Sequence, residues 1–223
     1  MSIRPPIRGV ILDFGGVLHD MRWDVSRELE GAYGLPRGVI AETLYRTPTW
    51  AEIERGRGDR TAWLAEAHRL LETRAGRPLP PLHDTWRAAQ RLNTANVDLA
   101  RALRPTYRTA ILSNADASLR GRLRALGIHD LFDTVVSSAE EGIAKPEPGI
   151  YRLAAERLSL PVEACVFVDD YEANVEAAVT VGMRAVLFRA DRGHELGEML
   201  AALGVRPGDL DPPDPPIGLG PIV

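Results

Sequence analysis

Four short apolar segments of the chain end in side chains that could do chemistry. Asp13 lies near the end of segment 9–14, Ser113 and Asn114 at the end of segment 109–113, Lys145 beyond segment 133–136, and Asp169 and Asp170 directly after segment 164–168. Burying a carboxylate costs free energy unless it is paired or bound to a cation. Asp13 could therefore be a nucleophile, a metal ligand or both. An aspartate that caps a turn or a helix is the alternative.

Two adjacent acids, Asp169 and Asp170, are hard to explain by packing. Carboxylates so close together repel one another unless a cation lies beside them. Mg²⁺, a hard cation that prefers oxygen ligands, suits such a pair. If Asp170 instead capped the next helix, that role would explain one acid and not both.

Lys145 is the only lysine among 27 basic residues, and the other 26 are arginines. An ammonium is compact whereas a guanidinium is planar and larger, so a lone lysine indicates a place that arginine cannot fill. Chance retention on the surface is the alternative. Beside a carboxylate nucleophile and a phosphate, an ammonium would neutralise developing charge. The hydroxyl of Ser113 could donate to the same anion, although serine is also common in turns.

The elements that must position these residues are five apolar segments typical of buried strands: 9–14, 109–113, 133–136, 164–168 and 185–188. Helical patterns follow the second, third and fourth of them, at 119–126, 149–158 and 173–181. Strands that alternate with helices predict an α/β fold with a Rossmann-like parallel sheet. Because ligands of such sheets bind at the carboxyl ends of the strands, we expect the polar side chains to meet there.

The stretch between the first two strands, roughly 20–95, has a helical pattern at 23–33, 37–45, 61–75 and near 84–92. In 61–75 the apolar residues share one helix face. We expect a core of residues 1–18 and 97–204 and an inserted helical cap of residues 19–96 that covers the site as a lid would. Helices packed directly on the sheet are the alternative. Six prolines in 205–223 predict an extended C-terminal tail.

The four segments and their order resemble the four motifs of the haloacid dehalogenase-like hydrolase superfamily. The resemblance covers residues 1–18 and 97–190, and Glu54-Arg55-Gly56 resembles a turn of many helical caps in that family. It implies that Asp13 is the nucleophile, forms an aspartyl-phosphate and binds Mg²⁺. It further implies metal ligation by Asp170, Asp169 and the carbonyl of Gly15, orientation of these ligands by Asn174, and phosphate binding by Ser113, Asn114, Gly16 and Lys145, of which Ser113 and Lys145 also serve catalysis.

One position departs from the family pattern. Phosphatases of the family usually carry a second aspartate two residues after the nucleophile, as general acid and base, and here that residue is Gly15. General acid–base catalysis contributes about 10²–10⁴-fold, so another group must supply it or the contribution is lost. His19 and Glu54 are the candidate substitutes, and either could equally be an ordinary surface residue.

The resemblance thus implies a Mg²⁺-dependent phosphatase that acts on a small phosphorylated metabolite. Because of Gly15, a catalytically weak or non-catalytic phosphate-binding homologue is the alternative. A 2-haloacid dehalogenase is less favoured. A halide leaves without a proton, but such enzymes look metal-independent and lack paired acids such as Asp169 and Asp170.

Composition argues against several other functions. The formal net charge of −4 offers no positive field to attract nucleic acid. The sequence shows no signal peptide and no apolar run of about 20 residues that could span a bilayer, and its single cysteine, Cys165, fits a reducing compartment. We expect a cytoplasmic monomer or homodimer. In that protein Cys165, Trp50, Trp63 and Trp86 would pack in apolar regions, and His68, His83, His129 and His194 would lie on the surface.

Overall fold

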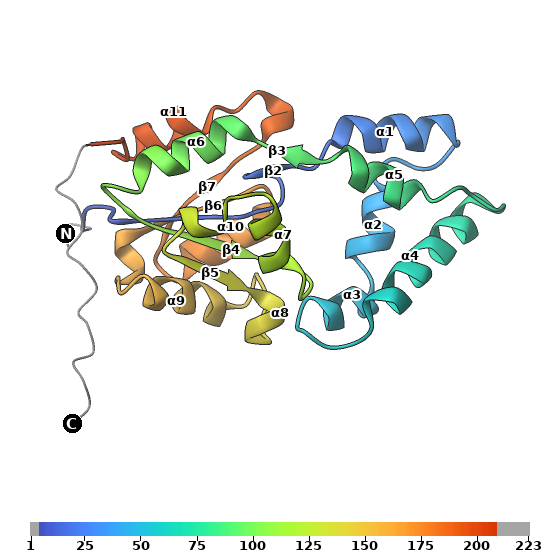
Figure 1. Ribbon diagram of the computed structural model, residues 1–223, viewed down its shortest axis with the longest axis horizontal. Helices are drawn as coiled ribbons and strands as arrows, with labels where there is room; N and C mark the ends of the chain where they lie inside the picture. The colour runs from blue at the N-terminus through green and yellow to red at the C-terminus, as the bar shows by residue number, and fades with distance from the viewer. Residues whose placement is uncertain (1–4, 209–223) are drawn as a thin grey trace.

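The computed structural model describes residues 5–208 and contains one five-stranded parallel sheet (Figure 1). Its strands are β1 (Gly9–Leu12), β4 (Arg108–Ser113), β5 (Thr134–Ser137), β6 (Cys165–Asp169) and β7 (Arg184–Leu187). The strand order is β5-β4-β1-β6-β7, and every pairing is parallel. The predicted α/β Rossmann-like fold is therefore confirmed.

Side chains of each strand alternate between two hydrophobic layers, as the pleat of a strand requires. Val10 and Leu12 of β1 pack against the layer that includes helices α6 (Thr94–Leu103), α7 (Leu119–Ala125) and α11 (Leu196–Ala202). Ile11 points to the opposite layer, with α9 (Pro148–Arg157) and α10 (Glu172–Thr180). In Figure 1, α6 and α11 lie above the sheet and α9 lies below it. Burial on both faces explains why the strands read as continuous apolar runs.

The register of the central strands brings the ends of three strands to one edge of the sheet. Leu12 pairs with Ile111 of β4 on one side and with Val168 of β6 on the other. After β1 the chain crosses to β4 and β5, and it later returns to β6 and β7 on the other side of β1. Such a change of direction opens a crevice at the carboxyl ends of the strands, where ligands of open α/β sheets bind.

Five helices lie between residues 20 and 91, and we call them the helical module: α1 (Trp23–Ala32), α2 (Val39–Tyr45), α3 (Pro48–Ile53), α4 (Arg60–Ala75) and α5 (Leu82–Ala89). They have an apolar cluster of their own, in which Trp50, Trp63 and Trp86 are buried. Figure 1 shows them beside the carboxyl-terminal edge of the sheet and not on its faces. Burial of the three tryptophans in this cluster matches their expected packing role.

The connection to the module contains a structure that the sequence pattern did not predict. Strands β2 (His19–Asp20) and β3 (Arg91–Leu92) are two residues long and pair antiparallel, so that the chain enters and leaves the module side by side. A two-residue strand is too short to show an alternating pattern. The short helix α8 (Ser138–Glu141), like α3, was also not predicted.

One of the histidines expected on the surface is buried. His83 is 5% exposed, and its Nε2 lies 2.9 Å from Oγ1 of Thr43. His83 lies on the buried face of α5, where its imidazole forms a hydrogen bond with Thr43. Because Thr43 is 40 residues away in the sequence, no local pattern reveals this contact.

Most of the proline-rich segment, residues 209–223, lies outside the described residues. Before it, Val205 is buried and the amide of Gly208 donates to Oγ1 of Thr106 at 3.1 Å. Within residues 5–208, the helices are all too short or too polar to cross a membrane.

Candidate active site

Asp13 follows β1 and is held by groups from two other segments. Its backbone amide donates to the carbonyl of Val168 at 2.9 Å, which continues the pairing with β6. Its Oδ1 accepts a hydrogen bond from the amide of Phe14 at 2.7 Å and lies 3.1 Å from Nζ of Lys145. Both donors contact the same oxygen, so the other oxygen of the carboxylate is left for a ligand.

Lys145 links Asp13 to Asp169 in the interior. Its Nζ lies 2.6 Å from Oδ2 of Asp169, and the side chains of the two residues are 1% and 0% exposed. Burial alone would lower the pKa of the ammonium, but the two carboxylates outweigh it and hold the pKa of Lys145 above its usual range. The lone lysine is thus a buried charged residue between two acids, and the alternative of a surface position is wrong.

The side chain of Asn114 holds the backbone of Lys145, a contact that the sequence pattern did not predict. Its Oδ1 accepts the amide of Lys145 at 2.8 Å, and its Nδ2 donates to the carbonyl of Lys145 at 2.9 Å and to Oε2 of Glu54 at 3.0 Å. Asn114 also lines the cavity that Asp13 and Ser113 line, and its contact with substrate stays a prediction.

Asp13, Asp169 and Asp170 form an acidic cluster whose ligand atoms all lie within 4.8 Å of one another. Burial first, and then the neighbouring charges of Asp13 and Asp169, raise the pKa of Asp170 to about 8. Burial also raises the pKa of Asp13 to about 6, although Lys145 opposes the shift. A divalent cation would relieve this repulsion, and carboxylate oxygens are the ligands that Mg²⁺ prefers.

The two adjacent acids are held very differently. Both oxygens of Asp169 accept hydrogen bonds from Nδ2 of Asn174 at 3.1 Å, and Oδ1 also accepts the amide of Tyr171 at 2.8 Å. Within the described part of the chain, the carboxylate of Asp170 has no hydrogen-bond partner, and the helix α10 begins after Tyr171 without a side-chain cap. Asp170 is therefore the acid that is free to bind a cation, and Asn174 fixes the orientation of Asp169.

Gly16 lies behind Asp170 and not in the main cavity. It has a φ of +78°, and a Cβ there would lie 2.1 Å from Oδ2 of Asp170. Its amide donates to the carbonyl of His19 at 2.8 Å. The amide of Gly16 thus closes the turn and its missing side chain makes room for Asp170, while its contact with substrate stays a prediction.

Gly15, in contrast, lines the main cavity and has room beside it. A Cβ at this position would have ordinary van der Waals contact, 3.6 Å, with Sδ of Met21, and Gly15 does not have the positive φ of Gly16. An L-amino acid thus fits here without strain. The fold therefore has room for an acidic side chain at position 15, although the residue there is glycine.

Both candidate substitutes for the missing acid line the same cavity as Asp13. Burial, and then Arg122, lowers the pKa of His19 to about 4, so His19 is neutral near pH 7. Burial raises the pKa of Glu54, although Arg55 and Asn114 act against the shift. A raised carboxyl pKa is the direction that a general acid requires, and Glu54 therefore suits that role better than His19.

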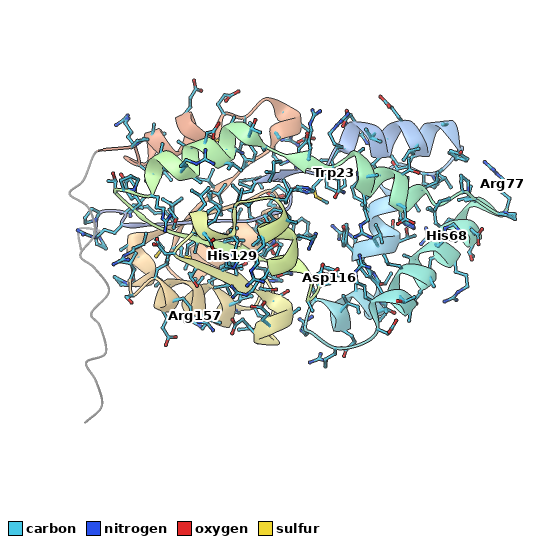
Figure 2. The ribbon with its side chains drawn as sticks, in the orientation of Figure 1. Trp23, His68, Arg77, Asp116, His129 and Arg157 are labelled. Carbon is cyan, nitrogen blue, oxygen red and sulfur yellow. The ribbon has the colours of Figure 1, made fainter. Side chains whose placement is uncertain are left out.

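The cavity lies between the sheet edge and the helical module and has a volume of about 650 Å³. Ser113 contributes to its wall, and the Ser113 hydroxyl makes no hydrogen bond to any group of residues 5–208. Figure 2 shows Asp116, another wall residue, on the side of the core that faces the module. The wall also includes Tyr45, Arg87 and Arg122. No sequence pattern singles them out, because they belong to three separate helices and to no motif.

A family model described as haloacid dehalogenase-like hydrolase matches residues 7–182 of the chain. The chain is 39% identical over 101 residues to a phosphatase of Mycobacterium tuberculosis, which covers 44% of this chain and 46% of that protein. The matches span 19%, 46% and 34% of the length of three curated relatives.

Solved structures share the fold at low sequence identity. One from Porphyromonas gingivalis, described as a predicted HAD-like family hydrolase, has a TM-score of 0.65 and 23% identity, with 91% of this chain and 100% of that chain covered. A HAD family enzyme from Bacteroides thetaiotaomicron, crystallised with magnesium and inorganic phosphate, has a TM-score of 0.61 and 22% identity, with 86% and 98% covered.

Proposed function

This chain belongs to the haloacid dehalogenase-like hydrolase family, and we propose that it is a Mg²⁺-dependent phosphatase of a small phosphorylated metabolite. One observation carries the proposal. Asp13, at the end of the central strand, and Asp169 share the buried ammonium of Lys145. Asp13 also lies beside Asp170, at the wall of the cavity. The phosphatase of Mycobacterium tuberculosis and the phosphate-bound enzyme of Bacteroides thetaiotaomicron are consistent with this activity.

In the proposed reaction, the free oxygen of Asp13 attacks the phosphorus of the ester. A bond forms between this oxygen and phosphorus, and the bond between phosphorus and the ester oxygen breaks, which leaves an aspartyl-phosphate and an alkoxide that takes up a proton. Water then attacks the phosphorus, and phosphate and the free carboxylate result. Lys145 holds the other oxygen of Asp13, and so directs the attacking oxygen towards the cavity.

The residues present fit a Mg²⁺ ion. Asp13 and Asp170 would hold it directly with the carbonyl of Gly15, and Asp169 would support it from behind. Bound Mg²⁺ neutralises charge on the phosphoryl oxygens and orients them for in-line attack. Ser113 would donate its free hydroxyl to a phosphoryl oxygen, and the ammonium of Lys145 would stabilise the charge that develops there. We propose Glu54 as the donor of the proton to the leaving alkoxide.

We also propose that the helical module acts as the cap that was expected from residues 19–96. It is joined to the core by the paired strands β2 and β3 and contributes Tyr45, Glu54 and Arg87 to the wall of the cavity. Residues from the module would then contact the part of the substrate that is not phosphate, and so determine which ester is accepted.

The nucleophile assignment is tested by Asp13→Asn. We expect this variant to lose measurable hydrolysis of p-nitrophenyl phosphate with Mg²⁺ present, because the amide cannot attack phosphorus, while its circular dichroism spectrum stays that of the parent. The matched control is Asp98→Asn, at an exposed position of α6, which should keep full activity. Substantial turnover by Asp13→Asn would refute the assignment, and turnover in the presence of EDTA would refute the metal.

Gly15 favours a second candidate, a phosphate-binding homologue that turns over slowly or not at all. Its signature would be binding of inorganic phosphate with Mg²⁺ and no steady-state hydrolysis of any phosphomonoester. The same assay therefore separates the two candidates. The acidic cluster does not favour a 2-haloacid dehalogenase, because release of a halide does not require a cation bound by three carboxylates.

A further inference from the structure

Among residues 5–208, several arginines of the cavity wall have no acidic partner, and two of them, Arg87 and Arg122, lie close enough to act on one another electrostatically. Arg87 lies on α5 of the helical module and Arg122 on α7 of the core, and both line the cavity wall. In the part of the chain that the structure describes, neither guanidinium has a carboxylate within ion-pair distance. Elsewhere in the protein arginines pair readily, as Arg120 does with Glu140 at 2.8 Å and Arg157 with Glu141 at 3.0 Å.

The acid of the cavity wall that interacts electrostatically with Arg122 is already engaged. Asp116 accepts a hydrogen bond from Nε of Arg60 at 3.1 Å and bonds to the amide of Ser118 at 2.8 Å and to its hydroxyl. Burial lowers the pKa of Arg122; Asp116 and Tyr45 act against this shift, while the like charge of Arg87 adds to it. Two like charges at one cavity wall repel one another, and an anion between them would relieve the repulsion.

A third polar group accompanies the two cations. The hydroxyl of Tyr45 lies within electrostatic range of both Arg87 and Arg122, and no group of residues 5–208 forms a hydrogen bond with it. Its ring is fixed by edge-on packing against Trp50, with ring centroids 5.1 Å apart. A rigid hydroxyl and two guanidiniums form a set of donors that suits an anionic oxygen group.

The donor set is close to the nucleophile and separate from it. The guanidinium carbon of Arg122 lies 5.7 Å from the ring centroid of Phe14, the residue after Asp13. Asp13 and the phosphate site are served by Lys145 and Ser113, so the two arginines are free to bind a different part of the same small molecule.

We infer that the substrate is a small phosphomonoester with a second anionic group, a carboxylate or a phosphate, on the alcohol side, bound by Arg87, Arg122 and Tyr45. The inference rests on the proposed phosphatase function and names its substrate class. The module and the core would each contribute one arginine, so that the second anion is bound only where the two parts face one another across the cavity.

Binding of inert analogues tests the inference without turnover. Calorimetry with Mg²⁺ would compare three phosphonates: 3-phosphonopropionate, with a carboxylate; ethane-1,2-bisphosphonate, with a second phosphonate; and 3-hydroxypropylphosphonate, with a neutral hydroxyl. We expect at least one of the two ligands with a second anionic group to bind about 10- to 100-fold more tightly than 3-hydroxypropylphosphonate. This is the range of a hydrogen bond to a charged group. Whichever of the two binds more tightly identifies the second anion.

Variants locate the effect. Arg122→Met and Arg87→Met should each remove most of this preference and leave binding of 3-hydroxypropylphosphonate within about threefold, since the phosphonate site is intact. Arg124→Met is the matched control: it lies on the same helix as Arg122, exposed and away from the cavity, and should bind all three ligands as the parent does.

The outcomes separate this inference from the proposed function. Equal binding of all three phosphonates by the parent, or a preference that survives in both arginine variants, would overturn the second-anion site even if p-nitrophenyl phosphate is hydrolysed. A preference lost in both variants would support it even if turnover were absent, and in that case only the proposed phosphatase function would fail.

Discussion

At the scale of single residues, the site depends on which carboxylate oxygen is occupied and which is free. Asp13 gives one oxygen to Lys145 and Phe14, Asp169 gives both to neighbouring donors, and Asp170 gives neither. Three acids of the same chemical type thus have three different environments. In the proposed mechanism, Asp13 supplies the attacking oxygen and holds the cation together with Asp170, and Asp169 supports both acids.

The size of the Lys145 pocket gives the first prediction at this scale. Lys145→Arg should lower kcat for p-nitrophenyl phosphate by roughly 10²-fold, the cost of removing one well-placed donor. A planar guanidinium cannot occupy a position that is 1% exposed and lies between two carboxylates without moving one of them. Steady-state kinetics check the outcome. Unchanged kinetics would contradict it.

Gly15 gives a second prediction, because it has space for a side chain. Gly15→Asp should raise kcat for alkyl phosphates by roughly 10²-fold, since it adds a general acid where an L-residue fits. The gain should be much smaller for p-nitrophenyl phosphate, whose leaving group needs no proton.

A second comparison checks the origin of that gain. In a Glu54→Gln background, Gly15→Asp should give a larger relative gain, because the proposed native donor is then absent. If Gly15→Asp lowers activity towards both kinds of ester, the missing acid is not what limits turnover.

At the scale of elements, α2 and α5 of the helical module are joined by a buried polar contact. His83 on α5 bonds to Thr43 on α2, and the hydroxyl of Thr43 also lies 2.9 Å from the carbonyl of Val39. Burial, followed by His68, lowers the pKa of His83 from 6.5 to about 4. The imidazole is therefore held neutral in the folded module, and its protonation favours the unfolded state.

The third prediction follows from this direction of shift. The folded pKa lies below the unfolded value, so stability from His83 is complete above about pH 6.5 and is lost as the pH falls towards about 4. The loss should approach 1.4 kcal/mol per pH unit within that window. Urea unfolding at several pH values measures it.

His83→Gln is the variant that isolates this contribution. It keeps a donor for Thr43 but does not titrate, so its unfolding free energy should fall less steeply between pH 6.5 and 4. His19→Gln should reduce the slope in the same way, because burial and Arg122 also lower the pKa of His19 to about 4. An identical slope in the parent and in His83→Gln would contradict the prediction.

At the scale of the whole molecule, the module and the core both line the cavity and meet at several points beside it. One of them is Gly56, which has a φ of +74° and lies so close to α8 that a Cβ would be 2.1 Å from the carbonyl oxygen of Ala139. The loop that carries Glu54 is thus in backbone contact with the core. The ion pair of Arg55 with Glu147, at 2.7 Å, lies at the same junction.

This contact gives the fourth prediction. Gly56→Ala should raise KM and lower kcat together, because the added methyl group forces the loop with Glu54 away from the core. Gly58→Ala is the matched control: it has the same kind of positive φ, but its Cβ would have ordinary contact, 3.5 Å, with Ile53. Both variants share a backbone strain of about 1–2 kcal/mol, so a kinetic difference between them reports the position of the module. Equal effects would show that only strain matters.

The sequence by itself determined the strands of the core and the polar residues at their ends. Buried parallel strands are continuous apolar runs, and that signal is local, so Asp13, Ser113 and Asp169 could be placed at one edge from strand order alone. The family motifs added the role of Lys145, which the single lysine of the chain had already marked.

Only the tertiary structure decided which groups meet across long stretches of chain. Asn114 holds the backbone of Lys145, 31 residues away. The two-residue strands at His19 and Leu92 pair with one another. Arg87 and Arg122 line one cavity from different parts of the molecule. Such contacts depend on how helices pack and turns close, and they leave no periodic trace in a sequence. Local patterns therefore predict elements and the residues at their ends, whereas packing decides which of those residues act together.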